Sequence, residues 1–257
     1  MEELRALEVL SSLKTVPQSN FVMVYDGTIE ATTLSQKIAV NTTVQMKRLA
    51  TKFTIGALVI PSITEGTATY TPDGLSVYLC NGINRTTLGG WDKDVVDDDD
   101  YFNTDSQEMS GPTETTIGTD TYEKYVTEDP IYSYPMEWEF NSKTEPYLMY
   151  VLRWKIVDDG STSYKDLYYK LTLGRRAITQ NEWYDISAKL TVLGSLYPEE
   201  PTEIYYYMDY LVKEWVDAYE VDSPNTPAVI KDTRYLAVPQ TEYTVNNKNE
   251  VVIPFSS

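Results

Sequence analysis

Apolar and polar positions alternate most regularly between Tyr168 and Ser195. Apolar side chains occupy every second position in two stretches, Tyr169, Leu171 and Leu173, then Tyr184, Ile186, Ala188, Leu190 and Val192. Successive side chains of a β-strand point to opposite faces, so this pattern predicts strands with one buried and one exposed face. Gly194 and Pro198 end the pattern. The segment therefore predicts an antiparallel, tyrosine-rich hairpin: two strands joined by a short polar turn.

Further strands are predicted along most of the chain. The segments with a strand pattern are 21–25, 38–60, 75–81, 131–138, 147–157 and 204–219, followed by two more between 234 and 257. Residues 38–60 are long for one strand and change face at Lys47 and Arg48, which predicts two strands and a β-bulge. Residues 147–157 begin apolar on both faces, which is typical of a central strand.

The opening segment 1–14 has a different spacing. Leucines recur at every third position, at Leu4, Leu7, Leu10 and Leu13, and Pro17 follows. A stripe of this kind predicts a short helix. Apart from this helix, the sequence predicts an all-β fold.

An acidic stretch interrupts the strand pattern between residues 89 and 130. Apolar residues are few there, and aspartates are concentrated between Asp92 and Asp105. We expect a long surface loop and a domain boundary in this stretch. The predicted boundary separates a first domain of residues 1–122 from a second domain of residues 123–257.

Composition narrows the classes of function. With 257 residues the chain can bury a core in one large or two small domains. A net charge of −18 disfavours electrostatic binding to nucleic acid or to an anionic membrane. No run of 18 apolar residues occurs, so no transmembrane helix is expected. The chain has 22 tyrosines and only 5 phenylalanines, and tyrosine suits half-buried strands and adhesive surfaces.

The residue types present exclude most catalytic sites. The chain has no histidine, which excludes serine-histidine-aspartate triads and histidine-ligated zinc. Glycine-rich phosphate-binding motifs are also missing, and the single Cys80 excludes an internal disulfide. We expect Cys80 to be buried and inert, because its neighbours are apolar. No catalytic, cofactor-binding or metal-binding residue is assigned, and no cofactor is expected.

Two kinds of site stay open at this point. The segment Asp92–Asp100 is the only metal candidate, but it has valines where ligands are needed and no glycine, so a solvated loop is favoured. Carboxylate pairs of a glycosidase, or tryptophans that stack on sugars, are also compatible with the composition. The tryptophans mostly have apolar neighbours, so packing in the core is the favoured role.

Several segments resemble bacterial fimbrillins, the type V pilus subunits of Bacteroides-type bacteria. The main signature consists of Tyr168-Tyr169, Ile178, Gln180-Asn181, Trp183 to Ile186, and Leu193-Gly194-Ser195. Arg48 to Lys52 and the segment 131–138 resemble further strands of that family. The sequence departs from the family at three places: Gln180 replaces an arginine, Met136 replaces an asparagine, and Ala50 lies one position early in the segment from Arg48 to Lys52.

The resemblance implies a fold, a function and a location. The fold would be two transthyretin-like β-sandwich domains, the first of which lacks its early strands and exposes an apolar groove. The function would be structural: a cell-surface subunit, located in a fimbrium at the outer membrane, that assembles with copies of itself or with related pilus subunits. Its contacts could extend to a host surface or to other bacteria. The alternative is a cell-surface carbohydrate-binding β-sandwich or a pilus-tip adhesin.

The turn in the main signature gives two local expectations. We expect the Asn181 side chain to bond backbone groups nearby, as asparagine does in turns. Tyr184 is expected to be buried with its hydroxyl group paired.

The C-terminal segment is the candidate for a donor strand. If residues 243–255 are extended, one face carries Tyr243, Val245, Val251, Ile253 and Phe255. Such a strand can complete its own domain or add to a sheet edge of the next subunit, with backbone hydrogen bonds providing affinity. Fimbrillins use a C-terminal segment as donor, and the resemblance therefore favours the second possibility.

Overall fold

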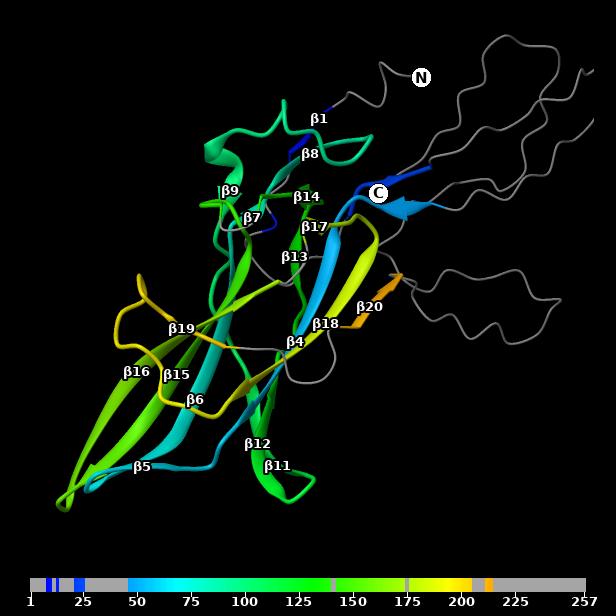
Figure 1. The fold of residues 1–257 in the computed structure, drawn as a ribbon. Coiled ribbons are helices and arrows are strands. Elements are labelled where there is room, and N and C mark those ends of the chain that lie inside the picture. Colours follow the sequence, from blue (N-terminus) through cyan, green and yellow to red (C-terminus); the bar gives the residue numbers. More distant parts are fainter. Residues whose placement is uncertain are drawn as a thin grey trace, which may run out of the picture.

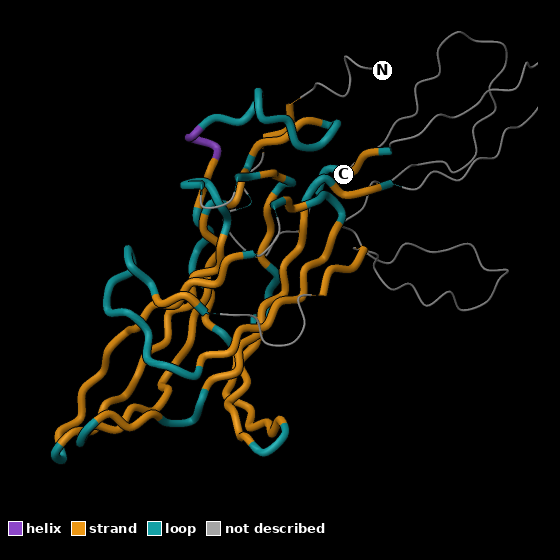
Figure 2. Tube along the Cα trace, in the orientation of Figure 1, coloured by secondary structure: helices purple, strands orange, loops and turns teal. Residues whose placement is uncertain are grey.

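The computed structural model describes residues 8–10, 13, 21–25, 46–139, 142–173, 176–204 and 211–214. This part of the chain is built almost entirely from β-strands, with one turn of 3-10 helix, η1 (Asp98–Asp100). Two larger sheets face each other in Figure 1, and Figure 2 shows strands and connecting loops with hardly any helix. The predicted all-β class is confirmed for these residues.

The first sheet, sheet I, has six strands. Their order is β10 (Gln107–Glu108), β6 (Ala68–Cys80), β15 (Tyr147–Asp158), β16 (Ser161–Thr172) and β19 (Thr202–Glu203), and β5 (Ile63–Glu65) also pairs with β6. β15 pairs with β16 on one side and with β6 on the other along nearly its whole length. The prediction of a central strand over 147–157 is therefore confirmed.

The second sheet, sheet II, also has six strands. Their order is β11 (Ser110–Ile117), β12 (Asp120–Val126), β4 (Thr51–Val59), β18 (Glu182–Leu190) and β20 (Leu211–Glu214), and β13 (Ile131–Ser133) also pairs with β4. β4 and β18 run parallel, with Ile186 opposite Ile55. The remaining strands are antiparallel to their neighbours.

Four small two-stranded pairs lie beside the main sheets. They are β1 (Glu8–Leu10) with β8 (Arg85–Thr87), β2 (Met23–Val24) with β3 (Lys47–Arg48), β7 (Gly82–Ile83) with β9 (Tyr101–Phe102), and β14 (Met136–Glu137) with β17 (Ala177–Ile178). The break between β3 and β4 falls at Leu49 and Ala50, close to the predicted bulge.

The core lies between the two sheets. Leu148, Tyr150, Leu152 and Trp154 of β15 pack with residues of β4 and β18 in one buried cluster. A hydrogen bond also joins the sheets, because the Tyr150 hydroxyl donates to the Gly56 carbonyl at 3.2 Å. A smaller buried cluster contains Leu13, Leu49, Ala50, Tyr132 and Tyr134.

The alternation of residues 168–190 is confirmed, but the predicted hairpin is wrong. Tyr169 and Leu171 on β16, and Tyr184 and Ile186 on β18, are all buried. However, β16 belongs to sheet I and β18 to sheet II, so the intervening residues cross the sandwich. Each strand buries its apolar face against the opposite sheet. Alternation shows that one face is buried, but it does not show whether the two strands pair with each other or lie in opposite sheets.

Three other expectations need correction. Residues 8–10 form β1, paired with β8, so the helix predicted over 1–14 is wrong there: pairing with a neighbouring strand overrides a weak local preference. The stretch 89–130 is not one long loop, because it contains the hairpin of β11 and β12. Val192 is 52% exposed, since β18 ends at Leu190.

The predicted domain boundary also differs from the observed pairing. β4 and β6 precede residue 122, yet β4 pairs with β18 and β6 pairs with β15. The boundary predicted between residues 122 and 123 therefore does not divide the described residues into two sandwiches. The acidic stretch 89–130 instead forms an exposed edge hairpin, β11 and β12, and the loop that precedes it.

Candidate functional site

The edges of the two sheets are the places where another strand could be added. β11 is a poor edge for this purpose, because it contains Pro112 and Glu114 and an irregular register between Ser110 and Thr113. Proline, charges and bulges are common ways to protect an edge. The outer end of β16, residues 161–166, carries only exposed and mainly polar side chains.

The edge of β18 is different. Residues 182–185 pair with β20, whereas no described residue pairs with 186–190 on that side. The Ile60 N–H donates to the Leu190 carbonyl at 3.0 Å, which directs the backbone groups of Leu190 towards β4. Backbone groups alternate in direction along a strand, so those of Ser187 and Lys189 point towards the other edge. Residues 186–190 of β18 are thus the part of this edge to which the described residues assign no partner, and the segment directly before β20, residues 205–210, lies outside the described residues.

Tyr184 anchors β18 in the core. Its side chain is fully buried and its ring stacks on Phe53, with 5.0 Å between the centroids. The hydroxyl donates to Glu182 Oε2 at 2.6 Å and accepts from the Thr179 N–H at 3.3 Å. The predicted burial and pairing of Tyr184 are confirmed.

Asn181 holds the start of β18 against the first part of the chain. Its φ of +59° lies in the left-handed region, which asparagine adopts more readily than most residues. Its side-chain oxygen accepts from the Arg48 N–H at 3.1 Å, and its own N–H donates to the Ala50 carbonyl at 3.1 Å. The expected local side-chain bond is wrong, because the partner lies 133 residues away.

Tyr169 explains two more parts of the signature. Its ring is fully buried, and a Cβ atom on Gly194 would lie 2.7 Å from Tyr169 Cζ, so only glycine fits there. The hydroxyl accepts from Trp154 Nε1 at 3.1 Å and donates to the Val192 carbonyl at 3.0 Å. Burial raises the pKa of Tyr169 to about 12. Tyr169 of β16 thus holds the segment that follows β18, through its contacts with Val192 and Gly194.

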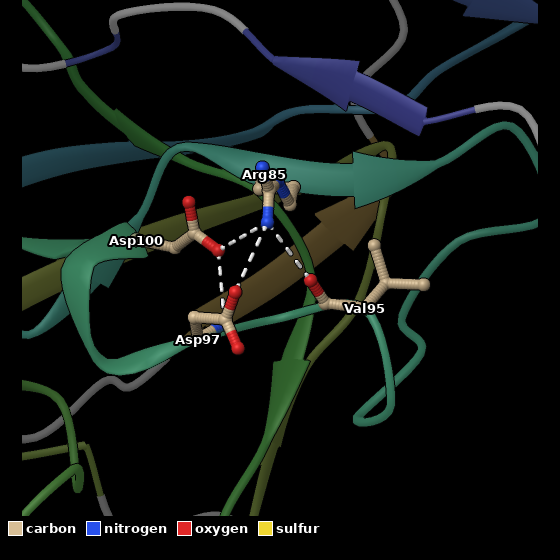
Figure 3. Close-up of polar contacts among 4 residues, drawn as sticks. All are labelled: Arg85, Val95, Asp97 and Asp100. Carbon is tan, nitrogen blue, oxygen red and sulfur yellow. Dashed lines mark hydrogen bonds and ion pairs between the residues drawn. The ribbon is translucent and has the colours of Figure 1, made fainter.

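Arg85 fixes the acidic loop, a role that the sequence analysis missed (Figure 3). Its Nη1 lies 3.2 Å from Asp100 Oδ2 and 3.5 Å from Asp97 Oδ2, and donates to the Val95 carbonyl at 3.1 Å. Asp100 Oδ2 also accepts from the Asp97 N–H at 2.9 Å. Asp100 is buried, while most of the aspartates before it are exposed. Because Arg85 lies opposite Leu10 in the β1–β8 pair, the same residue joins a strand pair to the loop.

The described residues show neither a metal-binding group nor a membrane-spanning helix. No group of three or more acidic or cysteine side chains is placed to hold a metal ion among them. Cys80 is buried as expected, and burial raises the pKa of its thiol to about 11. No helix in this part of the chain is long and apolar enough to cross a membrane. Trp138 and Trp154 are buried in the core.

The proposed donor residues Tyr243, Val245, Val251, Ile253 and Phe255 lie outside the described residues. So do Trp215 and the strands predicted between 234 and 257. Assembly by strand addition and the donor role of this segment therefore stay predictions.

Comparison with known proteins gives one informative similarity. The chain is 28% identical over 128 residues to the major fimbrium tip subunit FimD of Porphyromonas gingivalis, in two sequences from that species. The match covers 49% of this chain and 18% of the relative, so it spans less than a fifth of the longer protein. The resemblance to fimbrillins is confirmed by this similarity.

The chain was also compared with solved structures and with protein-family models. A crystal structure of a fimbrilin from Porphyromonas gingivalis W83 is 13% identical, with a TM-score of 0.42, over 86% of this chain and 76% of that one. No protein family model matches the chain.

Proposed function

We propose that the protein is a structural subunit of a bacterial surface fimbria. The observation that carries this proposal is the similarity to a fimbrium tip subunit over 128 residues. An all-β sandwich with a histidine-free sequence fits a structural role better than an enzymatic one. Its location is then the cell surface, in a fimbrium anchored at the outer membrane.

Assembly proceeds by strand addition in this proposal. Residues 186–190 of β18, which follow the residues paired with β20, receive an extended segment from a neighbouring subunit. The segment 243–255 is the donor. Such an addition gains affinity from backbone hydrogen bonds and specificity from side chains at alternate positions. The two-fold spacing of Tyr243, Val245, Val251, Ile253 and Phe255 suits this use.

A chain lacking residues 243–257 tests the donor role. The truncated protein should keep its far-ultraviolet circular dichroism and its cooperative unfolding but should not polymerise in sedimentation velocity. A synthetic peptide of residues 243–257 should bind it, whereas a peptide with Val251, Ile253 and Phe255 changed to serine should not. A truncated protein that unfolds, or that polymerises normally, contradicts the donor role.

A position at the tip of the fimbria is the second candidate, favoured by the name of the relative. A shaft subunit should appear along whole fibres in immunogold electron microscopy, whereas a tip subunit should appear at fibre ends. The adhesive and carbohydrate-binding alternatives belong with the tip position. They require binding to a glycan by a single subunit in isolation.

A further inference from the structure

The outward face of sheet I is unusually rich in tyrosine. In β15 the even-numbered residues from Leu148 to Trp154 point into the core, so the odd-numbered ones point outward. The register then places Tyr147, Tyr168, Tyr164 and Tyr78 on that outward face, on three adjacent strands. By contrast, the outward positions of β18 include Asp185, Ser187 and Lys189.

These tyrosines present apolar surface to solvent. Tyr164 is 48% exposed and Val157, on the same face, is 39% exposed. Tyr78, Tyr147 and Tyr168 are half-buried. Tyrosine and arginine are enriched at protein interfaces, because they combine a large apolar area with polar groups.

Cations lie over two of the rings and hold them in place. Arg153 Cζ lies 4.9 Å from the Tyr164 ring centroid, and Lys170 Nζ lies 5.0 Å from that of Tyr147. These rings lie on β15 and β16, which pair with each other along 12 residues, so we expect the face to keep its shape when it binds a partner. A rigid aromatic surface loses little conformational entropy on binding.

Charge indicates which partner fits. Three cations lie on or beside the face, Arg153, Lys155 and Lys170, and four acids, Asp73, Glu108, Asp166 and Glu203. The face is thus close to neutral in a chain whose net charge is −18. Two copies of the chain meet with the least repulsion through such a face, and a two-fold axis can set the cations of one against the acids of the other.

The size of the face sets the expected strength. Strands of 12 residues, three abreast, give a flat area about 40 Å long and about 10–15 Å wide. This area of about 400–600 Å² per copy is below the roughly 800 Å² of a standard interface. We infer that the outward face of sheet I, centred on Tyr164 and Tyr168, is the surface through which two copies of this chain associate side by side, weakly and reversibly.

Sedimentation velocity of the full chain, at concentrations up to the order of 1 mM, tests this inference. The protein should form dimers, and the paired change Tyr164→Ser and Tyr168→Ser should weaken dimerisation at least about 10-fold. Tyr25→Ser, at a 38% exposed tyrosine outside sheet I, is the matched control and should leave the dimer unchanged.

The test separates this inference from strand addition. Lys189→Pro removes a backbone N–H that points away from β4, so under the proposed function it prevents polymerisation but not dimerisation through sheet I. Three results would each overturn the inference. They are loss of the dimer in Lys189→Pro, an unchanged protein that stays monomeric, and a dimer that is as strong after the paired tyrosine change as before it. Circular dichroism of each variant must match that of the unchanged protein.

Discussion

Replacing Tyr184 measures how strongly β18 is held in the sandwich. The side chain has no exposed area and stacks on Phe53, and its hydroxyl binds Glu182 and the Thr179 N–H. Tyr184→Ala removes a large buried aromatic group and leaves a cavity, which costs about 3–5 kcal/mol. Tyr184→Phe keeps the ring and removes only the hydroxyl, so the expected loss is about 1–2 kcal/mol.

Urea unfolding followed by circular dichroism gives both values by linear extrapolation. The slope of the free energy against urea should stay constant, which shows that the change lies in stability. Tyr197→Ala is the control, because this tyrosine is 59% exposed, and its effect should stay within about 0.5 kcal/mol. A loss below about 1 kcal/mol for Tyr184→Ala would refute the buried position of β18.

Three further outcomes follow from local contacts. Gly194→Ala places a Cβ against the Tyr169 ring and should cost at least about 1–3 kcal/mol in the same urea assay; no change would contradict the close approach. Cys80 should react with a thiol reagent at pH 8 only after unfolding, because the thiolate is the reactive form and burial raises its pKa to about 11; rapid reaction of the native protein would contradict its burial. Arg85→Ala leaves the buried Asp100 without this cation and should lower the free energy of unfolding by about 1–3 kcal/mol, while residues 95–100 gain faster amide exchange; unchanged exchange would show that Arg85 does not hold the loop.

The sequence predicts the faces of the strands better than their partners. Alternation correctly assigns Tyr169 and Tyr184 to the core, because burial of one face depends only on the period of the strand. It cannot show that β16 and β18 lie in opposite sheets, since an apolar face is satisfied equally by either arrangement. The parallel pairing of β18 with β4 joins residues far apart in the chain, and no local pattern encodes it.

The signature motifs carry more information about tertiary contacts than their local spacing suggests. Asn181 binds the backbone of Arg48, and Gly194 makes room for Tyr169. A local interpretation assigns both residues only to turns. Arg85 has a weak signal in the sequence, because Lys93 lies closer to the run of aspartates. The role of Arg85 becomes evident only from its contacts with Asp97 and Asp100.

Acidic composition was the least reliable guide to structure. The segment between 110 and 126 forms a β-hairpin, in which Tyr122 and Tyr125 are buried while most of their neighbours are exposed. An edge hairpin needs few apolar residues, because only part of one face contacts the core. Low hydrophobicity therefore predicted exposure correctly but secondary structure incorrectly.

The most direct test of assembly at the β18 edge compares Lys189→Pro with Lys189→Ala. Both changes remove the lysine side chain, which lies over the Tyr122 ring at 4.6 Å, but only proline removes the N–H that points away from β4. Fibre formation is measured by sedimentation and electron microscopy, with the free energy of unfolding measured in parallel. The account predicts that Lys189→Ala polymerises, and that Lys189→Pro does not polymerise although it unfolds within about 1 kcal/mol of Lys189→Ala. Normal fibres from Lys189→Pro, or a loss of several kcal/mol caused by the proline alone, would contradict strand addition at residues 186–190 of β18.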